Sequence, residues 1–205
     1  MMSLDLTLYL VTDPRLCARH GLVETVVAAV RGGVTIVQLR DKQASDGELI
    51  DQARQLKTAL AGSGVPLIIN DRLAVAIESG ADGLHLGQGD GDVVAARAAL
   101  GEQAILGLSV QNHAQLARLD PAQLDYLGLG PVFATSTKHD HAQPLGFDGL
   151  AALVAASPLP AVAIGGLEAQ HVDKIRAAGA KGAAVVSAIC GQADPEAAAR
   201  MFYAL

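Results

Sequence analysis

The segment with the clearest chemical character is a polar loop between residues 128 and 146, GLGPVFATSTKHDHAQPLG. It carries three consecutive hydroxyls followed by a cation, namely Thr135, Ser136, Thr137 and Lys138. Hydroxyls donate hydrogen bonds and an ammonium group supplies positive charge, so this combination suits a bound oxyanion. A loop this long inside a domain is usually functional or disordered, and a solvated Ser/Thr loop is the alternative for this segment taken alone.

Two carboxylates follow neighbouring apolar runs, Asp71 after LIIN and Asp90 after HLGQG. Adjacent strands lie roughly 4.8 Å apart, so the two side chains are expected close together. Such a pair suits Mg²⁺, which takes few protein ligands and keeps its other positions for water and substrate phosphate. Either aspartate alone would be read as a turn or cap residue. Because Arg40, Lys42 and Lys138 are expected at the same mouth, we predict a Mg²⁺-bound diphosphate there.

A second anion site is predicted from Gly165-Gly166 and from Val186-Ser187. Glycine lets backbone N–H groups approach a phosphate closely, and the loops after the last two strands of a barrel often bind phosphate. The alternative is a Gly-Gly turn that serves backbone geometry only. With both anion sites, the mouth would take one diphosphate and one monophosphate.

These side chains need a scaffold that brings them to one side, and the hydrophobic pattern supplies it. Short apolar runs predict strands at Leu6–Val11, Thr35–Leu39, Pro66–Ile69, Gly83–Leu86, Ile105–Leu108, Tyr126–Leu129, Ala161–Ile164 and Ala183–Val186. Between them, helices are predicted at Leu22–Arg31, Asp46–Ala61, Leu73–Ser79, Val93–Leu100, His113–Leu119, Phe147–Ala156, Ala169–Ala178 and Pro195–Leu205. Eight strand–helix units predict a single α/β domain over residues 1–205, a (β/α)8 TIM barrel with its site at the carboxyl ends of the strands.

An open doubly wound sheet is the rival fold. It would usually carry a Gly-rich dinucleotide loop after the first strand, where this sequence reads Thr12-Asp13-Pro14-Arg15. Seven consecutive predicted strand ends carry polar or glycine residues, whereas the opposite ends carry mostly Gly, Ala and Pro. This sorting favours the barrel.

Composition excludes several classes of protein. The net charge of −6 and the lack of a Lys/Arg cluster with interleaved aromatics argue against nucleic-acid binding. No apolar run is long enough to span a membrane, and the start of the chain does not resemble a signal peptide. Cys17 and Cys190 are read as incidental core thiols, and a cytoplasmic location is expected. The Ala- and Leu-rich helical ring is compatible with a monomer or a homodimer.

At this point a family can be named. The segments LYLVTD, VQLRDK, LIINDR, HLGQGD, GLSV, GPVFATSTK, AIGG and VVSAI, in this order and spacing, resemble thiamine phosphate synthase over nearly the whole chain. The family joins a hydroxymethylpyrimidine diphosphate to a thiazole phosphate, releasing diphosphate and forming thiamine phosphate. Its biosynthetic thiazole donor is a carboxylated tautomer, so carbon dioxide is lost as well. The resemblance therefore implies a Mg²⁺-dependent transferase with two small-molecule substrates.

The resemblance also implies roles for individual residues. The pyrimidine diphosphate would be held by Gln38, Leu39, Arg40, Asp41, Lys42, Asn70, Ser109 and Lys138. Mg²⁺ would be held by Asp71 and Asp90, and the thiazole phosphate by Thr135, Ser136, Thr137, Gly166, Val186 and Ser187. Of these, Arg40, Lys42, Ser109 and Lys138 would be catalytic, because they stabilise charge on the leaving oxygens. The family often has Glu where this chain has Asp41, one methylene shorter.

Three other functions are alternatives. A thiazole tautomerase on the same barrel would not need Lys42, Asn70-Asp71 and Asp90 together. A sugar-phosphate epimerase or isomerase would need an acid/base pair at opposing strand ends, and a non-catalytic sensor of thiamine precursors would usually bring an output domain. Among the histidines, His85 is expected to satisfy a core hydrogen bond rather than orient a ligand. The tract at residues 139–141, HDH, is expected to be solvated rather than to bind zinc.

Overall fold

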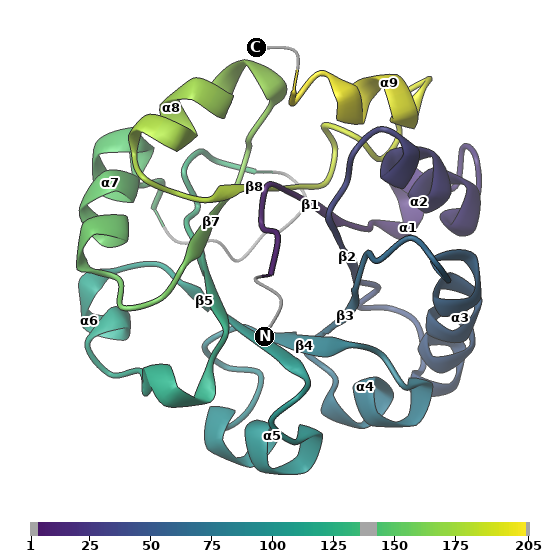
Figure 1. The fold of residues 1–205 in the computed structure, drawn as a ribbon, viewed down its shortest axis with the longest axis horizontal. Helices are drawn as coiled ribbons and strands as arrows, with labels where there is room; N and C mark the ends of the chain where they lie inside the picture. The colour runs from purple at the N-terminus through teal and green to yellow at the C-terminus, as the bar shows by residue number, and fades with distance from the viewer. Residues whose placement is uncertain (1–3, 136–142, 204–205) are drawn as a thin grey trace.

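The predicted strands close into a barrel. The computed structural model describes residues 4–135 and 143–203. Its strands are β1 (Leu8–Val11), β2 (Ile36–Leu39), β3 (Leu67–Asn70), β4 (Gly83–Leu86), β5 (Ile105–Val110), β6 (Tyr126–Leu129), β7 (Ala161–Ile164) and β8 (Gly182–Val185). Each strand pairs in parallel with its neighbours in sequence, and β8 pairs with β1 to close the ring. The predicted (β/α)8 TIM barrel is confirmed (Figure 1).

Helices surround the barrel on its outer side (Figure 1). They are α1 (Pro14–Cys17), α2 (Leu22–Arg31), α3 (Asp46–Ala59), α4 (Leu73–Ser79), α5 (Val93–Leu100), α6 (His113–Leu116), α7 (Gly146–Ala156), α8 (Val172–Ala177) and α9 (Pro195–Arg200), with 3₁₀ turns η1 (Pro121–Gln123) and η2 (Ala169–His171). Helix α4 ends at Ser79, as predicted, and its C-cap Gly80 has a left-handed φ of 67°.

Some predicted helix bounds were wrong, for local reasons. The helix predicted to Leu119 ends at Leu116, because Asp120 caps a 3₁₀ turn that Pro121 begins. The helix predicted to run to residue 205 ends at Arg200, and the hydroxyl of Tyr203 donates to the carbonyl of Gly33 at the end of α2. Helix α3 also ends before its predicted limit, and the helix predicted to begin at residue 169 is divided between η2 and α8.

One short helix escaped prediction. No helix is predicted between Val11 and Leu22, yet Pro14 opens α1. The Asp13 carboxylate accepts hydrogen bonds from the backbone N–H groups of Arg15 and Leu16, and proline at the first helical position fits the helix without losing a hydrogen bond.

Side chains alternate along each strand between the barrel interior and the helical layer. On β2, Ile36 packs with the interior cluster, whereas Val37 and Leu39 pack in the larger cluster under the helices. The interior cluster consists of Leu6, Tyr9, Ile36, Ile68, Tyr126, Val162 and Ala184. These side chains fill the lower part of the barrel. The inward-facing polar residues that come later on each strand therefore sit above an apolar plug, at the carboxyl mouth.

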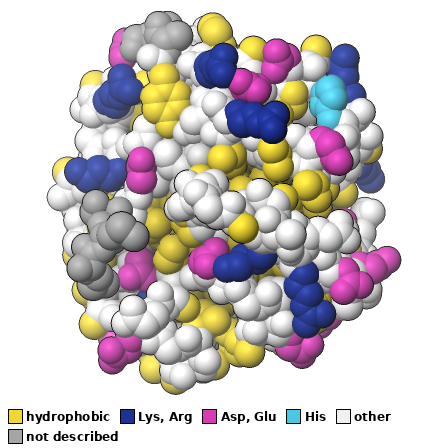
Figure 2. All heavy atoms as spheres, turned by 45° about the vertical axis from the view of Figure 1, so that its right-hand side comes forward, with side chains coloured by type: hydrophobic (Ala, Val, Ile, Leu, Met, Phe, Trp, Pro, Cys, Tyr) yellow, Lys and Arg dark blue, Asp and Glu magenta, His cyan; other side chains and the backbone are white. Residues whose placement is uncertain are grey.

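The outer surface carries charges of both signs. Figure 2 shows Lys/Arg and Asp/Glu side chains interspersed on the visible face, with apolar atoms between them. Within residues 4–135 and 143–203, no helix is long and apolar enough to cross a membrane.

Candidate active site

A cavity opens at the carboxyl ends of the strands, where the sequence predicted the site. Most of the predicted site residues that the structure describes line it, namely Gln38, Arg40, Lys42, Asn70, Asp71, Asp90, Ser109, Thr135, Gly166, Val186 and Ser187. They come from seven of the eight strand ends. The barrel therefore brings together Gln38 and Ser187, which lie 149 positions apart in the sequence.

Two predicted residues lie elsewhere. Leu39 is buried under the helical layer because it alternates with Gln38 along β2. The Asp41 carboxylate accepts the backbone N–H groups of Gln43 and Ala44, so it shapes the loop instead of lining the cavity. Neither residue lines the cavity, and the substrate-binding role expected for both stays a prediction. Ser136, Thr137, Lys138 and the 139–141 tract lie outside the described residues.

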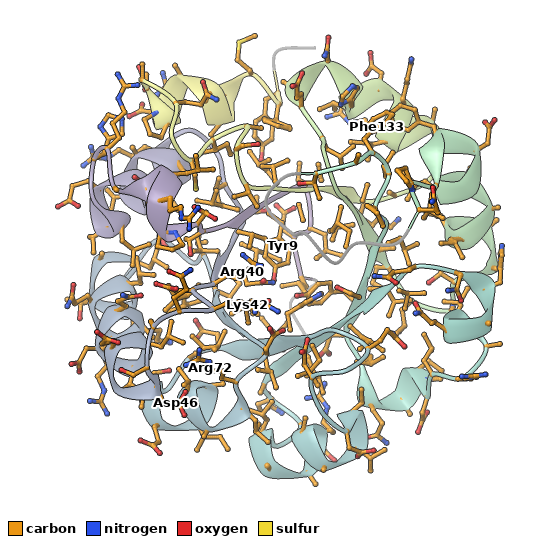
Figure 3. All side chains as sticks on the ribbon, turned by 180° about the vertical axis from the view of Figure 1, so that it is seen from behind. Tyr9, Arg40, Lys42, Asp46, Arg72 and Phe133 are labelled. Carbon is orange, nitrogen blue, oxygen red and sulfur yellow. The ribbon has the colours of Figure 1, made fainter. Side chains whose placement is uncertain are left out.

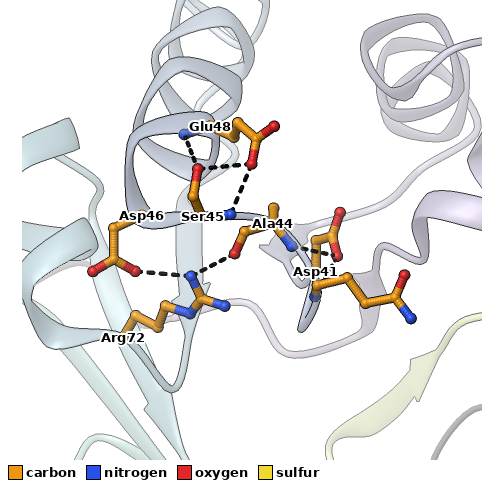
Figure 4. A network of polar contacts seen from close by, with 7 residues as sticks. Asp41, Ala44, Ser45, Asp46, Glu48 and Arg72 are labelled. Carbon is orange, nitrogen blue, oxygen red and sulfur yellow. Dashed lines mark hydrogen bonds and ion pairs between the residues drawn. The ribbon is translucent and has the colours of Figure 1, made fainter.

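The loop after β2 is held by a polar network, which Figure 4 shows from close by. Ser45 and Glu48 form a reciprocal cap at the start of α3. Arg72 donates to the carbonyl of Ala44 at 2.7 Å and to the Asp46 carboxylate at 2.8 Å. Lys42 lies between the Asp41 turn and this anchor, so the network fixes the backbone that carries it. In Figure 3, Arg40 and Lys42 lie near the middle of the barrel, whereas Arg72 and Asp46 lie farther out.

Asp71 and Asp90 meet at the mouth, as predicted. Burial first, and then the neighbouring Asp90 carboxylate, raise the pKa of Asp71 above its usual value, while Lys42 opposes the rise. Lys42 Nζ lies 3.3 Å from Asp71 Oδ2, and Asp90 Oδ2 accepts the backbone N–H of Gly87. Among the described non-glycine residues, Asp71 alone has a positive φ, 63°. Such backbone strain concentrates at functional sites.

This pair has the donor chemistry of a Mg²⁺ site. Both ligands are hard carboxylate oxygens, and their mutual repulsion is the kind that a divalent cation relieves. Within the described parts of the chain, no group of three His, Cys, Asp or Glu side chains could enclose a metal by itself. The arrangement fits an ion that completes its shell with water and substrate oxygens.

On the far side of the barrel, the glycine loop after β7 also faces the cavity. Gly165 and Gly166 have φ values of 95° and 61°, and a Cβ on Gly166 would lie 2.7 Å from the carbonyl oxygen of Ala134. Backbone geometry alone therefore requires glycine here. After β8 the chain makes a hydrogen-bonded turn, in which the N–H of Cys190 donates to the carbonyl of Val186, rather than the short extra helix often found at this place in barrels.

His85 satisfies core hydrogen bonds, as expected. Its Nδ1 lies 2.9 Å from the Tyr126 hydroxyl and its Nε2 lies 2.8 Å from Ser109 Oγ. The imidazole also lines the cavity, so it contacts the predicted catalytic serine directly.

The family model described as thiamine monophosphate synthase matches residues 8–189. The chain belongs to this family. Two relatives named thiamine-phosphate synthase are more than 50% identical to this chain. The one from Psychrobacter sp. (strain PRwf-1) is 54% identical over 202 residues, covering 97% of this chain and 94% of the relative. The one from Xanthobacter autotrophicus is 56% identical over 196 residues, covering 96% and 93%.

A solved structure supports the same assignment. The thiamine phosphate pyrophosphorylase from Pyrococcus furiosus superposes with a TM-score of 0.88 at 30% identity, covering 100% of this chain and 96% of that one. A 3-hexulose-6-phosphate synthase at 18% identity, with a TM-score of 0.66, shares the fold alone. As a member of the thiamine monophosphate synthase family, the protein is an enzyme of the transferase class.

Sequence reasoning missed two residues that shape this family site. Tyr9 lines the cavity, and Tyr126 joins Tyr9 to His85 below it. The signal that could have found them is that successive side chains of a strand face opposite sides, which places both rings in the barrel interior while Leu8, Leu10 and Leu127 pack under the helices.

Proposed function

We propose that this protein is a thiamine phosphate synthase, which joins hydroxymethylpyrimidine diphosphate to a (carboxy)thiazole phosphate. Thiamine phosphate and diphosphate leave, with carbon dioxide when the thiazole carries its carboxylate. The observation that carries the proposal is one cavity with two different walls. Asp71, Asp90 and Lys42 lie in the loops after β3, β4 and β2, and the Gly166 loop follows β7, across the barrel from β3. The two walls suit a metal-bound diphosphate and a monophosphate.

The chain's own cations would stabilise the leaving group. The aminopyrimidine donates electrons to its exocyclic CH₂, so the C–O bond to diphosphate can break before the new bond forms. Charge then develops on the departing oxygens. Arg40, Lys42 and Lys138 would supply positive charge there, and Ser109 would donate a hydrogen bond. Charge stabilisation of this kind needs no acid or base at the reacting carbon.

Asp71 and Asp90 would hold Mg²⁺. When bound, the ion would neutralise diphosphate oxygens and fix their position. Lys42 forms an ion pair with Asp71 beside this pair of carboxylates.

The second substrate needs positioning rather than activation, because its nucleophile is a neutral thiazole nitrogen. Gln38 and Asn70 would orient the pyrimidine. The thiazole phosphate would be held by the backbone and hydroxyl groups of Thr135, Ser136, Thr137, Gly166, Val186 and Ser187.

The discriminating experiment supplies the substrates separately and together. With the carboxythiazole phosphate alone, we expect no isomerisation; with the pyrimidine diphosphate added, we expect thiamine phosphate by mass spectrometry. Isomerised thiazole phosphate in the first mixture, with no thiamine phosphate in the second, would favour the tautomerase alternative.

A further inference from the structure

A continuous row of hydrogen bonds crosses the barrel beneath the cavity. Gln38 Nε2 donates to the Tyr9 hydroxyl at 2.8 Å, and the Tyr9 and Tyr126 hydroxyls lie 2.7 Å apart. The row continues from Tyr126 to His85 Nδ1 at 2.9 Å and from His85 Nε2 to Ser109 Oγ at 2.8 Å. It joins a residue proposed to orient the pyrimidine to one proposed to stabilise the leaving diphosphate, by way of three residues with no role so far.

The row is shielded from water. Tyr126 has no exposed surface, Tyr9 is 1% exposed, Gln38 4% and His85 8%. Burial raises the pKa of both phenols well above its ordinary value, so each keeps its single hydrogen at neutral pH. Buried donors without acceptors are costly, so every hydrogen in the row must point at a partner.

Counting hydrogens then fixes the direction of each bond. The Tyr9 oxygen accepts from Gln38, and the described residues offer its own hydrogen no acceptor other than Tyr126. Tyr126 therefore accepts from Tyr9 and donates to His85 Nδ1. A neutral imidazole that accepts at Nδ1 carries its hydrogen on Nε2, which then donates to Ser109 Oγ. The Ser109 hydrogen is left to point at a ligand in the cavity.

The strands leave room for this row. A Cβ on Gly107, next to Tyr126 in the β5–β6 register, would lie 2.2 Å from Cζ of the Tyr126 ring. A Cβ on Gly128 would lie 3.4 Å from Cε1 of His85. The Tyr126 ring therefore needs glycine at position 107, whereas a Cβ at position 128 would make only ordinary contact with the imidazole.

From this geometry we infer that Tyr126 and His85 are positioning residues, which hold the Ser109 hydroxyl as a donor toward the diphosphate end of the substrate. Tyr9 joins the Tyr126 hydroxyl to the Gln38 amide through hydrogen bonds. The inference rests on the proposed function for the identity of the ligand, but the direction of the row does not depend on it.

The first test needs no substrate. Nitrogen-15 NMR of ring-labelled protein reports which nitrogen of His85 carries the hydrogen, with His85→Gln used to assign its signals. We expect the Nε2–H form in wild type and in Tyr9→Phe, where Tyr126 still donates to Nδ1. In Tyr126→Phe, which removes that donor, we expect a mixture of the two forms. An Nδ1–H ring in wild type, or an unchanged ring in Tyr126→Phe, would overturn the inference.

The second test is kinetic. Tyr126→Phe should lower kcat roughly tenfold with little change in KM, less than the hundredfold or more typical of losing a direct donor such as Ser109. In a Ser109→Ala background the same substitution should cost little, because its effect passes through the missing hydroxyl. Tyr9→Phe removes an equally buried hydroxyl and should mainly raise KM for the pyrimidine diphosphate, through Gln38.

An equal loss from Tyr126→Phe in both backgrounds would indicate a purely structural role and overturn the inference. If wild type makes no thiamine phosphate, the proposed function fails, whereas the NMR result still decides the direction of the row.

Discussion

Lys42 Nζ lies 3.3 Å from Asp71 Oδ2, and the same carboxyl group faces Asp90. A cation from the loop after β2 and a carboxylate from the loop after β4 thus act in opposite directions on Asp71 at the cavity mouth. If Asp71 and Asp90 held a divalent ion, its charge would offset theirs and Lys42 would be available to the diphosphate. This relationship makes Asp71 the most informative position in the site.

Asp71→Asn should raise the Mg²⁺ concentration needed for half-maximal turnover at least tenfold, because one of two anionic ligands is lost. Steady-state rates across a Mg²⁺ titration measure this. Asp92→Asn, beyond the site at the start of α5, serves as the control and should keep the wild-type midpoint. An unchanged midpoint in Asp71→Asn would remove this residue from the metal site.

Asp71 should also make the folding stability of the metal-free protein depend on pH. Because the pKa of Asp71 is raised in the folded protein, folding favours its protonated form. That contribution is fully present below the unfolded pKa, about 3.8, and is lost as pH rises through the folded value. In chelator, Asp71→Asn should therefore have a higher melting temperature than wild type at neutral pH. The difference in melting temperature should shrink as the pH is lowered toward 4. Thermal melts across this range test it. Glu102→Gln, at an exposed position, is the control. A difference in melting temperature that grows as pH falls, or an equal difference in Glu102→Gln, would contradict a raised pKa for Asp71.

Lys138→Ala should lower kcat by about two to three orders of magnitude, the usual cost of deleting a preorganised charge stabiliser. Lys181→Ala is the matched control, because Lys181 is exposed and precedes β8 at the opposite end of the barrel. Equal rates for the two variants would place Lys138 outside the mechanism.

Substitutions at the amino ends of the strands should lower stability without changing activity. Asp125 accepts the backbone N–H of Leu106 and pairs with Arg97 at 2.7 Å, and the two side chains are 28% and 13% exposed. Asp82 pairs with Lys57 in the same way, but at 38% and 35% exposed. Asp125→Ala should cost about 2–4 kcal/mol of unfolding free energy and Asp82→Ala about half of that, because solvent screens the second pair. Urea unfolding measures both. Equal costs would refute the burial argument, and kcat should change in neither variant.

The fold was predictable because its signals are local and repeated. Eight apolar runs, each followed by a helix-forming segment, leave few topologies other than a barrel. Because the carboxyl ends of all the strands lie on one side of a barrel, Asp71 and Asp90 can be placed at the same mouth from the strand positions alone. Predicted helix ends were wrong where they depend on a single contact. At the end of α9, for example, the Tyr203 hydroxyl donates a hydrogen bond to the carbonyl of Gly33.

The row beneath the cavity was not predictable from the same signals. Tyr9 and Tyr126 are separated by 117 positions and read individually as apolar core residues. Their hydroxyls acquire a role only when barrel closure sets the register between β5 and β6 and Gly107 leaves space for a ring. For Asp41, the family resemblance implied a substrate contact; its carboxylate accepts the backbone N–H groups of Gln43 and Ala44, and the substrate contact stays a prediction.

The most direct test of the central claim is a single-turnover reaction of excess enzyme with both precursors, with Mg²⁺ or with chelator. We predict thiamine phosphate and diphosphate in a one-to-one ratio when Mg²⁺ is present, and a rate lower by orders of magnitude in chelator. Equal rates in the two mixtures would contradict the claim that a metal held by Asp71 and Asp90 stabilises the departing diphosphate.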